Sequence, residues 1–287
     1  TMETTLNLST VLYRRPATPA RKQGGLGTLF RPVDLIHGSC WRAILAFACP
    51  IILSYLLQQI YTISDAAIVG QTLTAQEVAG VNDTSALIFI FLQFAFGVSA
   101  GFCSVTSCRV GAHDDAGVRR SLAVQFLLSG ILTVLLTALA LALLDPMLAW
   151  INVTPESGEV YRAAHTYCAV IFAGIGAQLF YNFVCSFLRS MGDSATPLAF
   201  LLFSTVLNVG LDLLFILSFR WGVAGAAFAT VTAQLISTVG CFLYAFRRYP
   251  QLRLTKADWR FPRHEVTRHL IQGVPLGLQF STVSAPP

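Results

Sequence analysis

Six stretches of this sequence are long and apolar enough to span a lipid bilayer as α-helices. A bilayer core about 30 Å thick needs roughly 20 apolar residues per helix. The chain meets this requirement at residues 43–69, 84–108, 121–144, 160–188, 197–219 and 222–246. Only 11% of the 287 residues are charged, whereas about 25% are charged in an ordinary soluble domain. Because backbone groups in lipid must be bonded within each segment, we predict an all-α membrane protein with a six-helix transmembrane bundle.

Basic residues fall almost entirely on one side of this predicted bundle. Seventeen of the 19 Lys and Arg residues lie in the amino-terminal arm and the even-numbered connections, and only Arg162 and Arg220 lie elsewhere. The positive-inside rule places the basic side in the cytoplasm. We therefore expect a multi-pass protein of the plasma (inner) membrane with a cytoplasmic amino terminus. Since the basic residues lie between apolar stretches rather than along one face, we expect no nucleic-acid partner.

The order of segments suggests one complete repeat and the start of a second. No signal peptide is evident before the first apolar stretch. Pro50 and Pro275 each follow a basic segment and lie near the start of a predicted helix, as in a parallel internal repeat. We predict a flexible cytoplasmic arm, a transmembrane bundle, a basic cytoplasmic loop and the truncated start of a seventh helix, at residues 1–42, 43–246, 247–268 and 269–287.

Two acidic side chains lie inside the apolar stretches. Of the 14 Asp and Glu residues, only Asp65 and Asp212 are not in the arm, a connection or a helix end. An ionised carboxylate at the centre of a bilayer costs roughly 2.5–3.5 kcal/mol on insertion scales, so such residues usually have a function. Asp65 lies near the outer end of its helix, and an interfacial aspartate is the alternative. We expect the two carboxylates at similar depth in the outer half of the bundle.

Each of these aspartates ends a stripe of polar residues with helical spacing. The first stripe is Ser54, Gln58, Tyr61 and Asp65, and the second is Ser204, Asn208 and Asp212. A third stripe without an aspartate, Thr230, Gln234 and Ser237, lies in the last span. Residues three and four apart share one face of a helix. We expect these faces to line a hydrated cavity. For the stripe in the last span taken alone, hydrogen bonding between helices is the favoured interpretation.

Two carboxylates with amides and hydroxyls can bind a proton or a cation. In low-dielectric surroundings, neighbouring carboxylates favour uptake of a proton, Na⁺ or an organic cation. We therefore predict a proton or Na⁺ site at Asp65 and Asp212. The sequence contains no Walker A, HExxH, GxGxxG or GxSxG motif, so we expect no enzyme activity and no cofactor beyond the ion. We expect the glycines Gly97, Gly101, Gly174 and Gly176 to be sites of helix contact.

Several short motifs, in their order and spacing, resemble the amino-terminal half of multidrug and toxin extrusion (MATE) transporters. They are Pro50 to Ile52, Leu57 to Tyr61, Asp65 to Gly70, Gly97 to Gly101, Gly111 to Asp114, Leu188 to Asp193 and Leu207 to Asp212. The resemblance covers residues 35–285. It implies a fold of two six-helix bundles that face each other across a central cavity, with the second bundle missing from this chain.

The resemblance also implies roles for individual residues. Asp65 and Asp212 match acidic positions of the family that are implicated in cation coupling. Asn182, Asn208 and Thr230 are similar to their polar neighbours. The implied function is secondary active antiport, in which cationic amphipathic drugs or toxins are exported in exchange for H⁺ or Na⁺.

Two other functions are considered. A lipid-linked oligosaccharide flippase of a related fold should have arginines facing its cavity, whereas here nearly all the basic residues lie in connections. A non-transporting, truncated half-transporter is the other alternative, because a single bundle provides only half of the expected cavity wall. A downstream coding sequence with a second proline-led set of six helices would favour the antiporter.

Overall fold

The computed structural model describes residues 40–259 and 262–283, and the predicted arm lies almost wholly outside these ranges. All regular secondary structure within them is helical. The elements are α1 (Cys40–Thr72), α2 (Ala75–Gly111), α3 (Asp115–Ala142), α4 (Leu144–Trp150), η2 (Pro155–Ser157), α5 (Glu159–Ala173), α6 (Ile175–Ser190), α7 (Ala195–Asp212), η3 (Leu213–Ser218), α8 (Gly222–Arg248), η4 (Pro250–Leu252) and α9 (Arg263–Val283). The predicted all-α membrane fold is therefore confirmed. The described residues contain five membrane-length apolar helices, and a sixth span if α5 and α6 are counted together.

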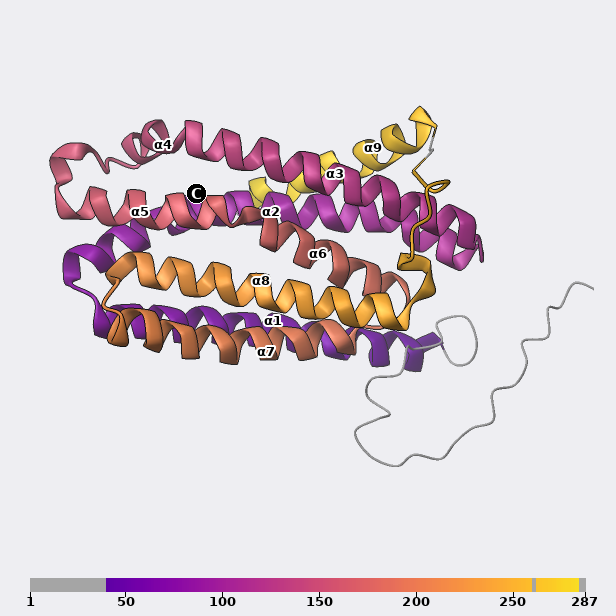
Figure 1. Ribbon diagram of the computed structural model, residues 1–287, viewed down its shortest axis with the longest axis horizontal. Helices are drawn as coiled ribbons and strands as arrows, with labels where there is room; N and C mark the ends of the chain where they lie inside the picture. The colour runs from indigo at the N-terminus through magenta and orange to yellow at the C-terminus, as the bar shows by residue number, and fades with distance from the viewer. Residues whose placement is uncertain (1–39, 260–261, 284–287) are drawn as a thin grey trace, which may run out of the picture.

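The long helices run alongside one another, and the chain reverses direction between successive spans when α5 and α6 are taken as one span (Figure 1). α1 packs against α7, α7 packs against α8, and α9 lies along α2. The connections from α2 to α3, from α6 to α7 and after α8 gather at one end of the bundle. We call this the basic end, because Arg109, Arg119, Arg120, Arg189, Arg247 and Arg248 lie there.

The fourth predicted span, residues 160–188, is broken at Gly174. α5 ends at Ala173 and α6 begins at Ile175, with a bend of 43° between them. A Cβ atom at Gly174 would lie 2.4 Å from the side chain of Val231 on α8. Glycine therefore allows α8 to pack into the bend, a close approach that periodicity alone does not reveal.

α2 begins earlier than the sequence pattern predicted. Thr74 caps the helix by accepting a hydrogen bond from the Glu77 backbone N–H, while the Glu77 carboxylate accepts one from the Thr74 N–H. This capping box satisfies donors that would otherwise be unpaired at the helix start. Asp83, which the sequence analysis placed outside the span, is an exposed residue of α2.

The fifth predicted span, residues 197–219, changes its winding at Asp212. α7 ends at this residue, and Leu213–Ser218 continue as the π-helix η3. π-helical segments are rare and occur often at functional sites. The irregularity therefore lies directly beside one of the two acidic residues singled out by the sequence.

The apolar interior lies between α2, α3, α5, α6 and α8. One buried cluster contains Leu87, Leu148, Phe172, Ile175 and Leu179. The expected role of the glycines in helix contact is confirmed, since Gly97 and Gly101 touch α9, Gly174 touches α8 and Gly176 touches α3. By contrast α1 is mostly exposed along its length, and only 6% of its most apolar stretch is buried. The interior is thus well packed on the α2 side, and α1 presents an open face.

Candidate cation site at a buried carboxylate pair

Asp65 and Asp212 face each other across the contact between α1 and α7. Asp212 is fully buried and Asp65 is partly buried. Their carboxyl groups lie close enough to interact electrostatically with each other. The two acidic residues that are far apart in the sequence are therefore neighbours in the fold.

Hydroxyl and amide groups surround this pair. The Asn208 side-chain amide, one turn before Asp212, donates a hydrogen bond to the Thr230 hydroxyl of α8 at 3.4 Å. The Tyr61 hydroxyl, one turn before Asp65, lies near the same threonine and near both carboxylates. Asn208 is fully buried, while Tyr61 and Thr230 are partly buried. Three helices thus contribute polar groups to one cluster.

Four buried oxygen atoms of the cluster have no hydrogen-bond partner among the described residues. They are Asp65 Oδ1, Asn208 Oδ1 and both carboxylate oxygens of Asp212. Buried polar atoms are almost always bonded in native proteins, and an exception calls for an explanation. All four are acceptors when the carboxylates are ionised. Such a set is suited to a bound proton or to a hard cation, which prefers oxygen ligands.

The other residues predicted to line a cavity are distributed along the same helices. Ser204 is buried, Gln234 is partly buried and Gln58 is exposed on the open face of α1. The Ser54 hydroxyl donates to the Pro50 carbonyl of its own helix at 2.8 Å. The side-chain nitrogen of Gln234 has no partner among the described residues.

Asn182 lies apart from the carboxylate cluster in its hydrogen bonding. It is buried on α6 and accepts a hydrogen bond from Gln178 at 3.4 Å, one turn earlier. Its own side-chain nitrogen has no partner in the described part of the chain. Asn182 therefore belongs to a separate polar contact of α6.

Tyr167 of α5 is a neighbour of the carboxylate pair that the sequence analysis missed. Its phenol lies close enough to Asp65, Tyr61 and Asp212 to interact electrostatically with all three. It belongs to no polar stripe, and a tyrosine within an apolar span is usually a packing residue. Only its position in three dimensions identifies it as part of the cluster.

The donor set does not suit a transition metal. No group of three or more His, Cys, Asp or Glu side chains capable of holding a metal ion occurs among residues 40–259 and 262–283. The available ligands are carboxylate, amide and hydroxyl oxygens, which favour hard ions over zinc or copper. The cysteines whose side chains the structure describes, Cys49, Cys103, Cys108, Cys168, Cys185 and Cys241, are free, and four of them are buried.

A helical bundle that encloses two carboxylates within spanning helices is typical of membrane transport proteins. The MatE family model matches residues 50–214, which is more than half of the chain. The chain therefore belongs to the MatE family.

Relatives and solved structures agree with this assignment. The chain is 30% identical over 259 residues to the probable multidrug resistance protein YpnP of Bacillus subtilis (strain 168), covering 88% of this chain and 55% of YpnP. It is 28% identical to YoeA of the same organism, covering 86% of this chain and 54% of YoeA. An outward-facing multidrug resistance MATE family transporter has a TM-score of 0.78 at 26% identity, over 88% of this chain and 56% of that structure. The chain spans about half the length of the relatives it matches.

Proposed function

We propose that this chain supplies one half of a secondary antiporter that exports cationic amphipathic compounds in exchange for H⁺ or Na⁺. Asp65 and Asp212 are the coupling carboxylates in this proposal, with Asn208, Thr230 and Tyr61 as their polar neighbours. Several relatives are described as multidrug resistance proteins, which supports export of small molecules. Because the chain spans about half of those relatives, the activity is proposed for the complete two-bundle carrier.

The observation that carries this proposal is the set of four unpartnered oxygens at the carboxylate pair. Two neighbouring negative charges repel strongly when apolar helices surround them. A proton or Na⁺ between them relieves this repulsion, and so does a cationic substrate that reaches the cavity. Competition between the two cations for one negatively charged site gives exchange, since each occupant favours release of the other.

We propose the orientation in which the basic end faces the cytoplasm of the cell. Arg109, Arg119 and Arg189 lie at this end, and the positive-inside rule places such residues on the cytoplasmic side. The carboxylate pair then lies in the half of the membrane nearer the outside. In this orientation the coupling ion reaches the site from the side where its concentration is higher.

The decisive experiment is gradient-driven efflux of a fluorescent organic cation from vesicles that contain the complete carrier. Asp212→Asn keeps the size and hydrogen-bonding capacity of the side chain but removes its charge. We expect substrate binding to persist and efflux to fall at least about tenfold, which corresponds to about 1.4 kcal/mol. Asp83→Asn is the matched control, because Asp83 is exposed on α2 and its loss should leave efflux unchanged. Undiminished gradient-driven efflux by Asp212→Asn and Asp65→Asn would contradict carboxylate coupling.

A further inference from the structure

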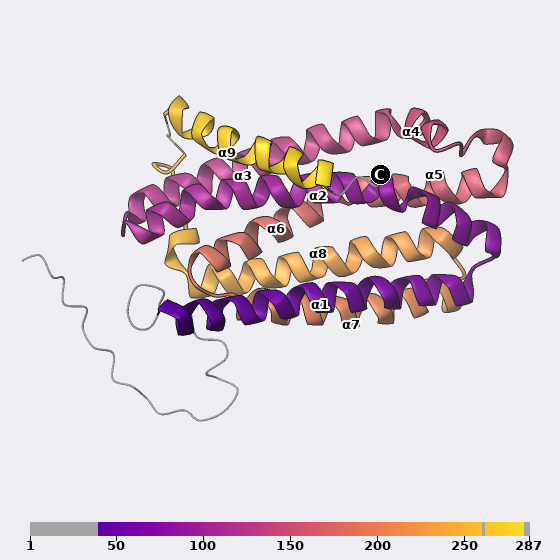
Figure 2. The ribbon, with the colours of Figure 1, turned by 180° about the vertical axis from the view of Figure 1, so that it is seen from behind.

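α9 lies along α2 for its whole described length, although the basic loop separates it from the first six spans (Figures 1 and 2). At the end of α9 away from the loop, the Ser281 hydroxyl donates to the Ile90 carbonyl of α2 at 3.2 Å. Phe280 packs edge-on against Phe96 with ring centroids 5.4 Å apart. The contact between the two helices therefore extends well beyond a single crossing point.

At the middle of this contact, two pairs of glycines bring the backbones together. A Cβ atom at Gly101 of α2 would lie 2.5 Å from the Gln272 carbonyl oxygen and 2.6 Å from Gly273 Cα. One turn away, a Cβ atom at Gly97 would lie 2.8 Å from Gly277 Cα. Glycines spaced four apart allow such approach between helices in membranes. The side chains of Phe102 and Val98 on α2 lie directly against Gly273 and Gly277, so the two helices are held closely together at this crossing.

Pro275 lies between the two glycines of α9. A proline inside a helix removes one backbone hydrogen bond and commonly produces a kink. The weakest part of the α9 backbone thus coincides with its closest approach to α2. This segment, residues 273–277, has the properties of a hinge.

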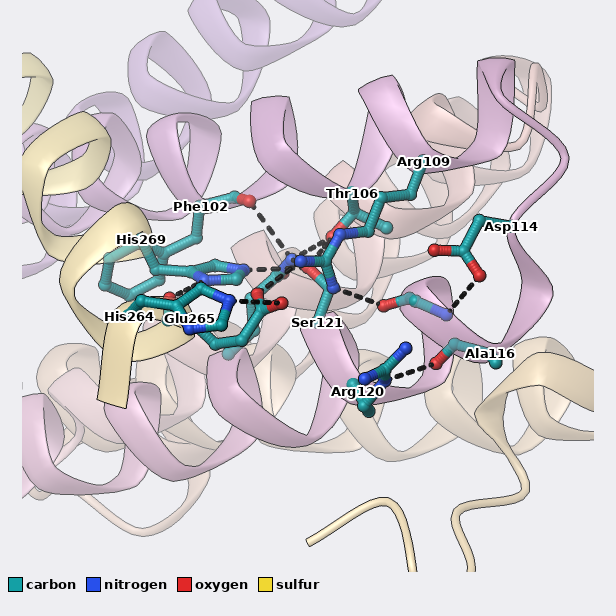
Figure 3. Close-up of polar contacts among 12 residues, drawn as sticks. Phe102, Thr106, Arg109, Asp114, Ala116, Arg120, Ser121, His264, Glu265 and His269 are labelled. Atoms are coloured by element: carbon teal, nitrogen blue, oxygen red, sulfur yellow. Dashed lines mark hydrogen bonds and ion pairs between the residues drawn. The ribbon is translucent and has the colours of Figure 1, made fainter. Parts of the chain in front are cut away.

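Between the hinge and the basic end, the contact includes several buried polar groups. Arg109 of α2 forms an ion pair with Glu265 of α9, and it also donates to the Gly117 carbonyl at 2.6 Å (Figure 3). His269, fully buried, lies 2.7 Å from the Ser121 hydroxyl through Nε2 and 2.7 Å from the Glu265 carbonyl through Nδ1. Because a carbonyl oxygen only accepts, Nδ1 carries a hydrogen.

The polar contact continues into the first bundle. The Ser121 hydroxyl of α3 lies 2.7 Å from the Thr106 hydroxyl of α2. The Gln125 side chain donates to the Phe102 carbonyl at 3.1 Å and also to Thr106. These groups join α2, α3 and α9 in a single chain of hydrogen bonds (Figure 3).

We propose that residues 263–272 of α9 form a latch that closes the basic end of the bundle by docking on α2 and α3, and that swings at the 273–277 hinge when it is released. The latch consists of Glu265 and His269 of α9 with Arg109 and Ser121 as their partners. When the latch opens at a membrane surface, water replaces the hydrogen bonds that these polar groups lose. Opening an apolar contact of the same size would instead expose apolar surface to water without any such replacement.

The role of the latch in transport rests on the proposed function, since exchange requires access to the carboxylate pair from one side at a time. Docking of the latch itself rests only on the contacts between α9, α2 and α3. Its closed form seals the basic end, and its release opens that end toward the proposed cytoplasmic side.

Hydrogen–deuterium exchange on the whole chain in lipid nanodiscs tests the latch without measuring transport. Glu265→Gln leaves Arg109 buried without its counter-charge, and removal of one partner of a buried ion pair is strongly unfavourable. We expect backbone amides of residues 264–272 to exchange faster by on the order of tenfold or more. Amides of residues 278–283, beyond the hinge, should keep their wild-type rates.

Two further variants make the outcome specific. Asp258→Asn removes a different ion pair at the same end, that with Arg119, and should leave α9 exchange unchanged. Ser121→Ala removes one hydrogen bond to His269 and should accelerate the same segment by a smaller factor. Unchanged exchange in Glu265→Gln, or faster exchange along all of α9, would overturn the latch. Because vesicle efflux is a separate measurement, failure of the latch and failure of carboxylate coupling are distinguishable.

Discussion

Two buried polar clusters of this bundle differ in how completely their groups are bonded. At the carboxylate pair of Asp65 and Asp212, four oxygen atoms have no partner among the described residues. At the latch, Arg109 and both ring nitrogens of His269 have partners. Buried polar groups cost free energy unless they are paired. We therefore interpret the incompletely paired cluster as the proposed binding site, and the completely paired cluster as a place where helices are joined.

The largest expected effect comes from removing both carboxylates. If the pair acts as one site, Asp65→Asn combined with Asp212→Asn should reduce coupled efflux little more than either single variant, because residues that act as a unit are non-additive. Vesicle efflux under an imposed H⁺ or Na⁺ gradient measures this. If the double variant instead loses efflux by the product of the two single losses, the carboxylates act as independent sites. The comparison between one incompletely bonded site and the fully bonded latch would then fail.

A medium effect is expected at the glycine crossing of α2 and α9. Gly101→Ala places a methyl group 2.5 Å from a backbone carbonyl, and overpacking of this kind typically costs about 1–3 kcal/mol. Gly130→Ala on α3 is the matched control, since nothing lies within 4 Å of its added Cβ. That substitution should be neutral or stabilising by up to about 1 kcal/mol through helix propensity. Thermal unfolding in detergent compares the two, and equal melting temperatures would contradict close packing of α9.

The smallest effect concerns the loop that precedes α9. Burial of the Asp258 carboxylate raises its pKa, but hydrogen bonds from Thr255 and the charge of Arg119 outweigh burial and leave the pKa below its ordinary value. An aspartate with a depressed pKa stabilises the fold above its unfolded pKa of about 3.9 and loses that contribution as pH falls through the folded value. The melting temperature should therefore fall below about pH 4.

The same acid titration with Asp258→Asn provides the comparison for the loop. This variant lacks the titrating carboxylate, so its melting temperature should fall less steeply in the same range. Parallel acid profiles for the two proteins would show that this ion pair adds nothing to stability.

Hydropathy and charge predicted most of the fold, because membrane-spanning helices must be apolar over a fixed length. Asp65 and Asp212 could be identified because carboxylates are rare in such spans. Helical spacing then indicated that Tyr61 lies on the same helix face as Asp65, and Asn208 on the same face as Asp212. Tyr167 could not be identified, because its part in the cluster depends on how α5 packs against α2 and α8. The bend at Gly174 likewise depends on Val231, a residue of another helix.

The latch could not be predicted from the sequence for a related reason. Glu265 and His269 fall in and beside a basic loop, where the ordinary expectation is a solvated residue. Their burial follows from the glycine crossing, which draws α9 onto α2 and carries these side chains into contact with α3. Long-range packing thus converts residues with no local signal into members of a buried cluster.

The π-helical segment after Asp212 has a consequence for comparing this chain with its relatives. A π turn closes its hydrogen bonds five residues apart instead of four, so it accommodates one residue more than a regular helix. Loss of a single residue within Leu213–Ser218 would restore α-helical winding while Asp212 stays in place. Without a gap at this point, an alignment to a relative with regular winding would misplace the following residues by one position, or about 100° around the helix axis. The π-helical segment after α7 is therefore a place where a single-residue insertion or deletion can be accommodated.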